Sequence, residues 1–269
     1  MGKFDGVLLV SDYDNTLGIG ETIPPDNLAM LDWFTAHGGR FTVATGRAFH
    51  TFRYIRDQNP YNTPVLLSNG AQIYDFQQEK LLSESLLPPT VAQDMAHLAR
   101  LRPEMSLEAY RGETDIYVWN PNPVVENHLA HVNCTVHFCP IDQIPLPWGK
   151  TILEHDRPTL LSLQAELLSR WGDRYEAAFS AETMLELGAK GCTKGNCVLK
   201  LAGMLGIKRE NLYCVGDNEN DLSMLEVSAI PFAPANAIPE VRAFPGLHLL
   251  PRCNEGAVAA LIRHLDTLY

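Results

Sequence analysis

The chain has 269 residues, a hydrophobic fraction of 46%, a charged fraction of 20% and a formal net charge of -11. This length favours one large domain or two modest ones, and no segment combines the low hydrophobicity and high charge typical of disorder. The acidic balance, without a run of Lys and Arg, argues against a nucleic-acid-binding protein. We therefore expect a fully folded chain whose excess of acid suits a metal site.

The apolar runs and the cysteines give expectations about the compartment. Runs such as residues 7–10 and 63–67 are far shorter than the roughly 20 residues needed to cross a bilayer. The N-terminal segment lacks the apolar stretch and cleavage site of a signal peptide. The six cysteines form no C-x-x-C pair, so they indicate reduced thiols rather than a zinc framework or a dense disulfide scaffold. We expect a cytoplasmic protein without a membrane span.

Residues 6–67 alternate between strand and helix patterns. The apolar run over residues 6–11 predicts a buried parallel strand, and Pro25 opens a helix that Gly38 ends. Two further strands are expected at residues 41–44 and 65–67, with a helix over residues 49–58 between them. This β-α-β-α-β series predicts a parallel sheet with helices on both faces, whose ligands gather at the carboxyl ends of the strands.

The alternation lapses from about residue 73, where prolines become frequent and residues 106–119 suggest a hairpin. It resumes near Gly195 with predicted helices ending at Leu205 and covering residues 221–225 and 256–268, and a strand at residues 212–215. We therefore predict an α/β fold with a Rossmann-like parallel-sheet core. This core comprises residues 1–75 and 187–269 and is interrupted by an inserted α+β domain at residues 76–186.

Two motifs follow the first predicted strands. Asp12 and Asp14 lie two positions apart on an extended segment, so both carboxylates face one point above the sheet edge. Thr45 and Gly46, at the end of the next strand, offer a hydroxyl and backbone N–H groups that suit a phosphate oxygen. Taken alone, each motif equally fits a polar turn.

Two more motifs lie where the core resumes. Lys194, followed by Gly195, opens a predicted helix and places a compact positive charge at the strand edge, although an isolated lysine is usually solvated. Asp217 and Asp221 follow the strand at residues 212–215 and could supply hard oxygen ligands for Mg²⁺ or simply cap the next helix. All four motifs fall at carboxyl ends of predicted parallel strands, which favours a single site.

This ordered set resembles the haloacid dehalogenase superfamily, and in detail its Cof-type phosphatases with a type IIB cap. Nearly the whole chain takes part in the resemblance, and Ser68-Asn69-Gly70-Ala71 is similar to the family segment that precedes the cap. Asp12 and Asp14 match the motif D-x-D-x-T, and Thr45 matches the threonine of the second motif. Lys194 matches the lysine of the motif K-G. The motif G-D-x-x-N-D is matched by Asp217, Asn220 and Asp221.

The resemblance implies a Mg²⁺-dependent phosphatase with Asp12 as nucleophile and Asp14 as general acid and base. It implies metal binding by Asp12, Asp14 and Asp217, with Asp221 as either a further ligand or a partner of one. Together with Asp12 and Asp14, the catalytic set includes Thr45 and Lys194. The residues expected to bind the phosphate or the rest of the substrate are Thr45, Gly46, Arg47, Asn69, Lys194 and Asn220.

The sequence departs from the family pattern in two places. Asn15 stands where glycine is common, and asparagine tolerates left-handed backbone angles better than most residues. Pro231 and Pro234 lack backbone donors in the segment before Asn236, which puts the local geometry there in question. The set of catalytic residues is nevertheless complete.

Other functions remain open at this point. A phosphotransferase or mutase shares the aspartyl-phosphate, whereas a non-enzymatic phosphate receiver would need neither Asp14 nor a large insertion. We expect a small phosphorylated metabolite as the substrate, a sugar phosphate before a nucleotide or a phosphoprotein, and a monomer or weak homo-oligomer. The inserted domain carries polar and aromatic residues to which we assign no role: Tyr110, Arg111, Tyr117, Trp119 and His128.

Overall fold

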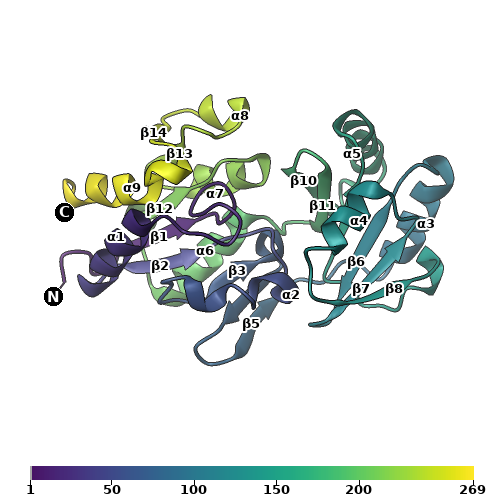
Figure 1. Cartoon of the computed structure of the whole chain (residues 1–269), viewed down its shortest axis with the longest axis horizontal. Coiled ribbons are helices and arrows are strands. Elements are labelled where there is room, and N and C mark those ends of the chain that lie inside the picture. Colours follow the sequence, from purple (N-terminus) through teal and green to yellow (C-terminus); the bar gives the residue numbers. More distant parts are fainter. Residues whose placement is uncertain (1) are drawn as a thin grey trace. The chain divides into compact units, whose positions relative to one another are not determined.

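A computed structural model describes residues 2–269 and divides the chain into two compact units (Figure 1). The first comprises the chain up to Gly46, Tyr54–Ser83 and Thr193–Tyr269, and the second comprises Arg47–Arg53 and Glu84–Cys192. The boundaries predicted at residues 75 and 187 lie several residues from these, and residues 47–53 were predicted in the first unit. Among the described residues, no helix combines the length and apolar character needed to span a membrane.

The first unit is built on a parallel sheet with the order β14-β13-β12-β1-β2 (Figure 1). Because β1 pairs in parallel with β2 on one side and β12 on the other, all its residues are buried, and this accounts for its continuous apolar sequence. The strands of this sheet are β1 (Leu8–Ser11), β2 (Arg40–Val43), β12 (Leu212–Val215), β13 (Pro231–Pro234) and β14 (His248–Leu250).

Helices cover both faces of this sheet, as the predicted alternation requires. Helix α1 packs against α9, and α6 packs against α7, where Val198 and Met224 join a core with Leu8 and Val10 of β1. The bounds of these helices, with the short α8, are α1 (Pro25–Ala36), α6 (Lys194–Leu205), α7 (Leu222–Val227), α8 (Pro239–Arg242) and α9 (Ala257–Asp266). The α/β class with a parallel-sheet core is confirmed.

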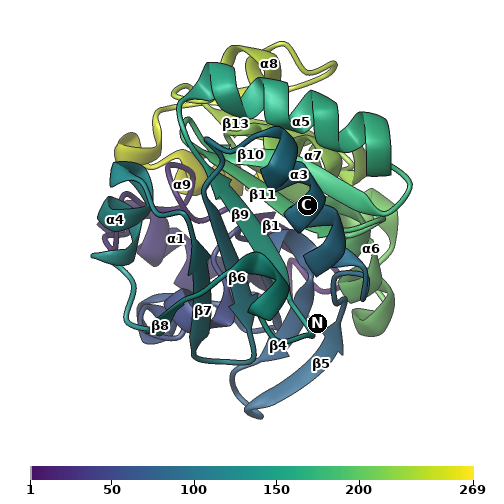
Figure 2. The ribbon, with the colours of Figure 1, turned by 90° about the vertical axis from the view of Figure 1, so that its right-hand side faces the viewer.

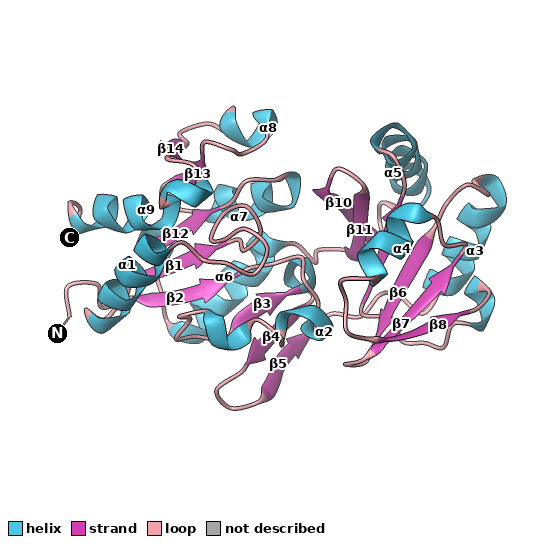
Figure 3. Cartoon of the chain, viewed as in Figure 1, coloured by secondary structure: helices cyan, strands magenta, loops and turns pink. Residues whose placement is uncertain are grey.

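A small sheet with the order β3-β4-β5 adjoins the end of β2, since Ala44 bridges in parallel to Leu66 (Figure 3). Its strands are β3 (Val65–Leu67), β4 (Gln72–Asp75) and β5 (Lys80–Glu84). The predicted strand at residues 65–67 is therefore present, and β4 turns back from it in antiparallel register.

The helix predicted over residues 49–58 is too long. Helix α2 covers only Phe49–Phe52, and a single 3₁₀ turn follows at Arg56–Gln58. The segment is rich in aromatic and β-branched residues, which lose side-chain freedom in a helix, so its intrinsic helix propensity is low. The segment therefore forms only short helical turns.

The second unit is an α+β domain on a mostly antiparallel sheet with the order β10-β11-β9-β6-β7-β8. Helices α3 and α5 cover one face, where Leu107 and Leu153 belong to their core (Figure 2). The opposite face carries Tyr110 and Ile152, with Val125 of α4 packed on them. Its elements are α3 (Val91–Leu101), β6 (Leu107–Arg111), β7 (Asp115–Trp119), α4 (Pro123–Leu129), β8 (Thr135–Phe138), β9 (Lys150–Glu154), α5 (Arg157–Trp171), β10 (Tyr175–Ala181) and β11 (Met184–Ala189).

His50 of α2 is buried in the second unit, with its ring edge-on to Tyr110 at a centroid distance of 5.4 Å. Burial, followed by the nearby charge of Lys150, lowers the pKa of His50 to about 4. The unfolded chain therefore takes up a proton near pH 6.5, whereas the folded protein does so only near pH 4. Stability that depends on neutral His50 is thus lost as the pH falls through this window.

We predict that His50→Leu flattens the pH dependence of stability between pH 7 and pH 4. The loss of unfolding free energy over this range should be smaller in the variant by up to about 3 kcal/mol, as measured by urea denaturation at each pH. His131→Gln, at an exposed histidine, is the control and should follow the wild-type profile. Parallel profiles for wild type and His50→Leu would contradict the prediction.

Candidate functional site

The carboxyl ends of β1 and β12 lie side by side and bring the first and last motifs together (Figure 1). Asp12 follows β1 directly, and its backbone N–H donates to the carbonyl of Val215, the last residue of β12, at 2.9 Å. Asp217 lies two positions beyond Val215. Parallel pairing of two strands that are distant in sequence therefore places both carboxylates at one edge of the sheet.

Lys194 joins these carboxylates from the first position of α6. Its Nζ donates to Asp12 Oδ1 and to Asp221 Oδ1, each at 2.6 Å, and its side chain is fully buried. Thr193 caps the helix by accepting a hydrogen bond from the Asn196 N–H, which fixes the start of α6. The lysine is thus part of a buried ion network rather than solvated.

The loop after β12 is organised around Asp221. Its Oδ2 accepts hydrogen bonds from the backbone N–H groups of Asp217 at 2.8 Å and Asn218 at 3.0 Å. A side chain at Gly216 would place its Cβ only 2.4 Å from the Cβ of Asp221, so only glycine fits. The second carboxylate, Asp217, accepts at Oδ1 from the Thr16 hydroxyl at 2.7 Å.

The electrostatics of the site follow from burying several charges together. Burial is the largest influence on Asp12 and raises its pKa, while Lys194 opposes the shift. Burial and then the neighbouring charge of Asp221 raise the pKa of Asp217 to about 7. For Lys194 the two carboxylates outweigh burial, so its pKa rises and it stays a cation.

Asp12, Asp217 and Asp221 form a compact group of buried ligands. Each offers one carboxylate oxygen, and the three oxygens lie within 4.8 Å of one another. Hard oxygen donors of this kind suit Mg²⁺ or Ca²⁺ better than a soft metal. When all three carboxylates are ionised, they exceed the Lys194 cation by two negative charges, which a divalent cation would neutralise.

The remaining predicted site residues lie in the neighbouring loops. Asp14 is half-buried just after Asp12, and its charge acts on both Asp12 and Asp217. Thr45 is buried, and its carbonyl accepts from the Asn69 N–H at 3.0 Å. The Asn220 side chain donates to Asn69 Oδ1 at 2.9 Å and so links the last motif to the Ser68-Asn69-Gly70-Ala71 segment.

Gly46 and Arg47 fall on different sides of the division between the units. Gly46 ends the first segment of the first unit, next to Thr45, whereas Arg47 begins the segment that belongs to the second unit. Both are half-buried. Printed contacts therefore connect Thr45 through Asn69 to Asn220, which precedes Asp221, whereas Arg47 is described with the second unit.

The two departures from the family pattern are accommodated. Asn15 takes a left-handed conformation with φ of 60°, as expected for asparagine in a glycine position. Pro231 and Pro234 occupy the first and last positions of β13, where the strand still pairs with β12 and β14. Asn236 donates to the Asn15 carbonyl at 2.8 Å, so the segment after β13 supports the loop that follows Asp12.

Sequence reasoning missed the contacts that Thr16 and Asn236 make. Thr16 was present as the last residue of the D-x-D-x-T motif, but its partner, Asp217, is 201 positions away. The sequence draws attention to Asn236 only because prolines precede it. A motif shows which residues are present but not which backbone carbonyl or carboxylate each will contact.

The whole chain is similar to known hydrolases. Residues 9–262 match the family of haloacid dehalogenase-like hydrolases. A relative named HMP-PP phosphatase from Serratia proteamaculans is 27% identical over 266 residues, covering 97% of this chain and 92% of the relative. An Escherichia coli protein with the same name is 26% identical over 262 residues, covering 97% and 92% respectively.

Solved structures agree with this relationship. A haloacid dehalogenase-like hydrolase from Bacteroides thetaiotaomicron has a TM-score of 0.80 and 25% identity, covering 98% of this chain and 100% of its own. A subclass IIB sugar phosphatase has a TM-score of 0.83 at 22% identity, covering 97% and 99%, and so shares the fold. The chain belongs to the haloacid dehalogenase-like hydrolases, as its motifs and its inserted α+β domain predict.

Proposed function

We propose that the chain is a Mg²⁺-dependent phosphatase that hydrolyses small phosphate monoesters through an aspartyl-phosphate on Asp12. The observation that carries this proposal is the buried Asp12 carboxylate at the end of the central strand, held 2.6 Å from the Lys194 ammonium. The family to which the chain belongs, and relatives named as phosphatases, support the reaction class.

In the first step, a carboxylate oxygen of Asp12 attacks the phosphorus in line with the ester bond. The new bond joins Asp12 to phosphorus while the bond from phosphorus to the alcohol oxygen breaks. Asp14 donates a proton to the leaving oxygen, so the alcohol departs neutral. Its half-buried position beside Asp12 supports this role, because a proton donor must reach both substrate and solvent.

In the second step, water replaces the carboxylate. Asp14, now ionised, takes a proton from the attacking water as the water oxygen bonds to phosphorus. The bond between phosphorus and Asp12 breaks, which releases inorganic phosphate and restores the carboxylate. One residue thus acts as acid and then as base, with no net proton gained or lost by the protein.

The phosphate oxygens need positive charge and hydrogen-bond donors. Lys194 supplies the charge, and the Thr45 hydroxyl, the Gly46 N–H and the Asn69 and Asn220 side chains supply donors around it. The contact between Asn220 and Asn69 supports a shared role, because it holds two loops at one sheet edge. We include Arg47 in this group as a further cation for the substrate.

The residues of the first unit fit a hard divalent cation. Asp12, Asp217 and the Asp14 backbone carbonyl would hold it. When bound, Mg²⁺ would offset the repulsion between the Asp12 carboxylate and the phosphate. Asp221 is a positioning residue in this scheme, since Lys194 and two backbone N–H groups already occupy its oxygens.

We propose a small phosphorylated metabolite as substrate, with a sugar phosphate before a nucleotide. Relatives named as phosphatases support a small phosphorylated substrate. The relatives named HMP-PP phosphatase make that compound a required member of any substrate panel.

Asp12→Asn should abolish turnover while preserving the fold. The amide has the shape of the carboxylate but is a far weaker nucleophile, so we expect kcat/KM to fall by at least about a thousandfold. Circular dichroism and denaturation would check the fold. The control is Asp57→Asn at an exposed aspartate, which should retain wild-type activity. Appreciable turnover by pure Asp12→Asn would contradict the mechanism.

Asp14→Asn should separate the two steps. With an activated ester whose alcohol leaves without a proton, Asp12 can still be phosphorylated, but the phosphoenzyme should persist because no base activates water. Rapid-quench mass spectrometry would measure its decay. Decay as fast as in wild type would show that Asp14 is not the base.

Lys194→Met should destabilise the protein and impair turnover. It leaves buried carboxylates without their counter-ion, so the free energy of unfolding should fall by about 3–5 kcal/mol without Mg²⁺ and recover in part when Mg²⁺ is added. Lys190→Met is the matched control, because Lys190 is exposed and should contribute less than about 1 kcal/mol. Equal effects from the two substitutions would contradict the buried role.

Release of inorganic phosphate across a substrate panel tests the function directly. The panel should hold hexose and pentose phosphates, HMP-PP, nucleotides and a phosphopeptide, each with Mg²⁺ and with excess chelator. We expect a small ester to give the highest kcat/KM and the chelator to abolish activity. Unchanged activity in chelator, or a preference for the phosphopeptide, would overturn the proposal.

A further inference from the structure

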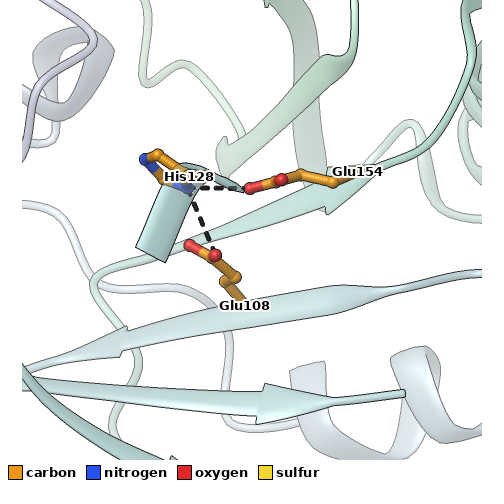
Figure 4. A group of neighbouring side chains, drawn as sticks. All are labelled: Glu108, His128 and Glu154. Carbon is orange, nitrogen blue, oxygen red and sulfur yellow. Dashed lines mark hydrogen bonds and ion pairs between the residues drawn. The ribbon is translucent and has the colours of Figure 1, made fainter. Parts of the chain in front are cut away.

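A second group of metal-ligating side chains lies in the second unit, among residues with no assigned role (Figure 4). Glu108 comes from β6, His128 from α4 and Glu154 from the end of β9, and the three side chains point toward one another. The His128 Nδ1 lies 3.2 Å from Glu108 Oε1 and 2.9 Å from Glu154 Oε1. Both glutamate side chains are 0% exposed, and the His128 side chain is 19% exposed.

The local fold builds this group rather than leaving it to flexible side chains. Glu108 pairs with Ile152 across antiparallel strands, so Glu154, two residues on, projects from the same face of the sheet. Asn122 caps α4 by accepting from two backbone N–H groups, and its own side chain donates to the Glu154 carbonyl at 2.8 Å. This bond fixes the helix that carries His128 to the strand that carries Glu154.

One buried carboxylate oxygen of the group lacks a hydrogen-bond partner among residues 2–269. Tyr110 donates to Glu108 Oε2 at 2.9 Å, which satisfies that carboxylate. Glu154 Oε2 is buried, yet it has no hydrogen-bond partner within residues 2–269. A buried acceptor without a donor costs about 1–3 kcal/mol, and more when it is charged. This oxygen has an unused lone pair on a carboxylate that faces two other ligands.

We propose that Glu108, His128 and Glu154 bind a divalent transition-metal ion, with Zn²⁺ as the best match. Two carboxylates and one neutral imidazole would balance the charge of such an ion. Mixed oxygen and nitrogen donors suit Zn²⁺ rather than Mg²⁺.

The distances fit this ion. Ligands about 2.1 Å from Zn²⁺ in tetrahedral geometry lie about 3.4 Å from one another. The two contacts of His128 Nδ1, at 3.2 Å and 2.9 Å, need to lengthen by only a few tenths of an ångström. All three ligand atoms lie within 4.8 Å of one another.

A proton competes with the metal for His128. Burial lowers the pKa of this residue, but hydrogen bonds with Glu108 and Glu154 outweigh it and raise the pKa to about 10. Without metal, a protonated His128 ring faces Glu108 and Glu154, and burial raises the pKa of Glu154, which disfavours a second buried anion beside it. Zn²⁺ would replace the proton and neutralise the group, and it would tie α4 to the sheet.

Equilibrium dialysis of the whole chain tests the site. The protein is dialysed against about 10 µM Zn²⁺ with millimolar Mg²⁺, which occupies oxygen-only sites, and retained zinc is measured by mass spectrometry. We expect one retained equivalent in wild type and at least about tenfold weaker binding in Glu154→Gln and in His128→Gln. Zinc should raise the Tm of wild type by several degrees but not that of these two variants.

Two controls make the outcome specific. His131→Gln, near the end of α4, and Asp217→Asn, in the first unit, should both keep the bound zinc. Zinc kept by both Glu154→Gln and His128→Gln, zinc lost from Asp217→Asn, or no zinc bound by wild type would each overturn the proposal. The test requires no phosphatase activity, so it stands or falls separately from the proposed function.

Discussion

The first unit depends on one buried ammonium group. Lys194 bridges Asp12, which is 182 positions away in sequence, and Asp221, which is 27 positions away. Asp221 in turn holds the backbone of the loop after β12 through its other oxygen. The three charges can be buried only because each is paired, and breaking a buried pair usually costs several kcal/mol. Charge pairing therefore fixes the sheet edge before any substrate binds.

Much of the fold could be predicted because periodicity and fold topology act together. The run ending at Ser11 and the run ending at Val215 both predicted buried strands, and parallel pairing then required their carboxyl ends to meet. Residues 49–58 have low intrinsic helix propensity, and the α-helix there covers only four residues. The boundaries of the units also depend on contacts between distant residues, which no local pattern contains.

The candidate site was predictable in its members but not in its contacts. The motif residues could be named because each stands at a strand end, whereas the bond between Thr16 and Asp217 depends on a loop closing across the sheet. Glu108, His128 and Glu154 gave no signal at all, since 20 and 26 positions separate His128 from its two partners. Adjacent antiparallel strands and a capped helix bring them together, and only the three-dimensional structure reveals that arrangement.

The net charge of -11 is thus not spread evenly as solvated surface. Part of the acid is buried as two groups of carboxyl side chains, one in each unit. The donors differ, because Asp12, Asp217 and Asp221 offer only oxygen, whereas the second group adds the imidazole of His128. Oxygen-only groups favour hard ions, and an imidazole nitrogen favours transition metals. The chemistry of each set of ligands, rather than the total charge of the chain, therefore decides which cation that set favours.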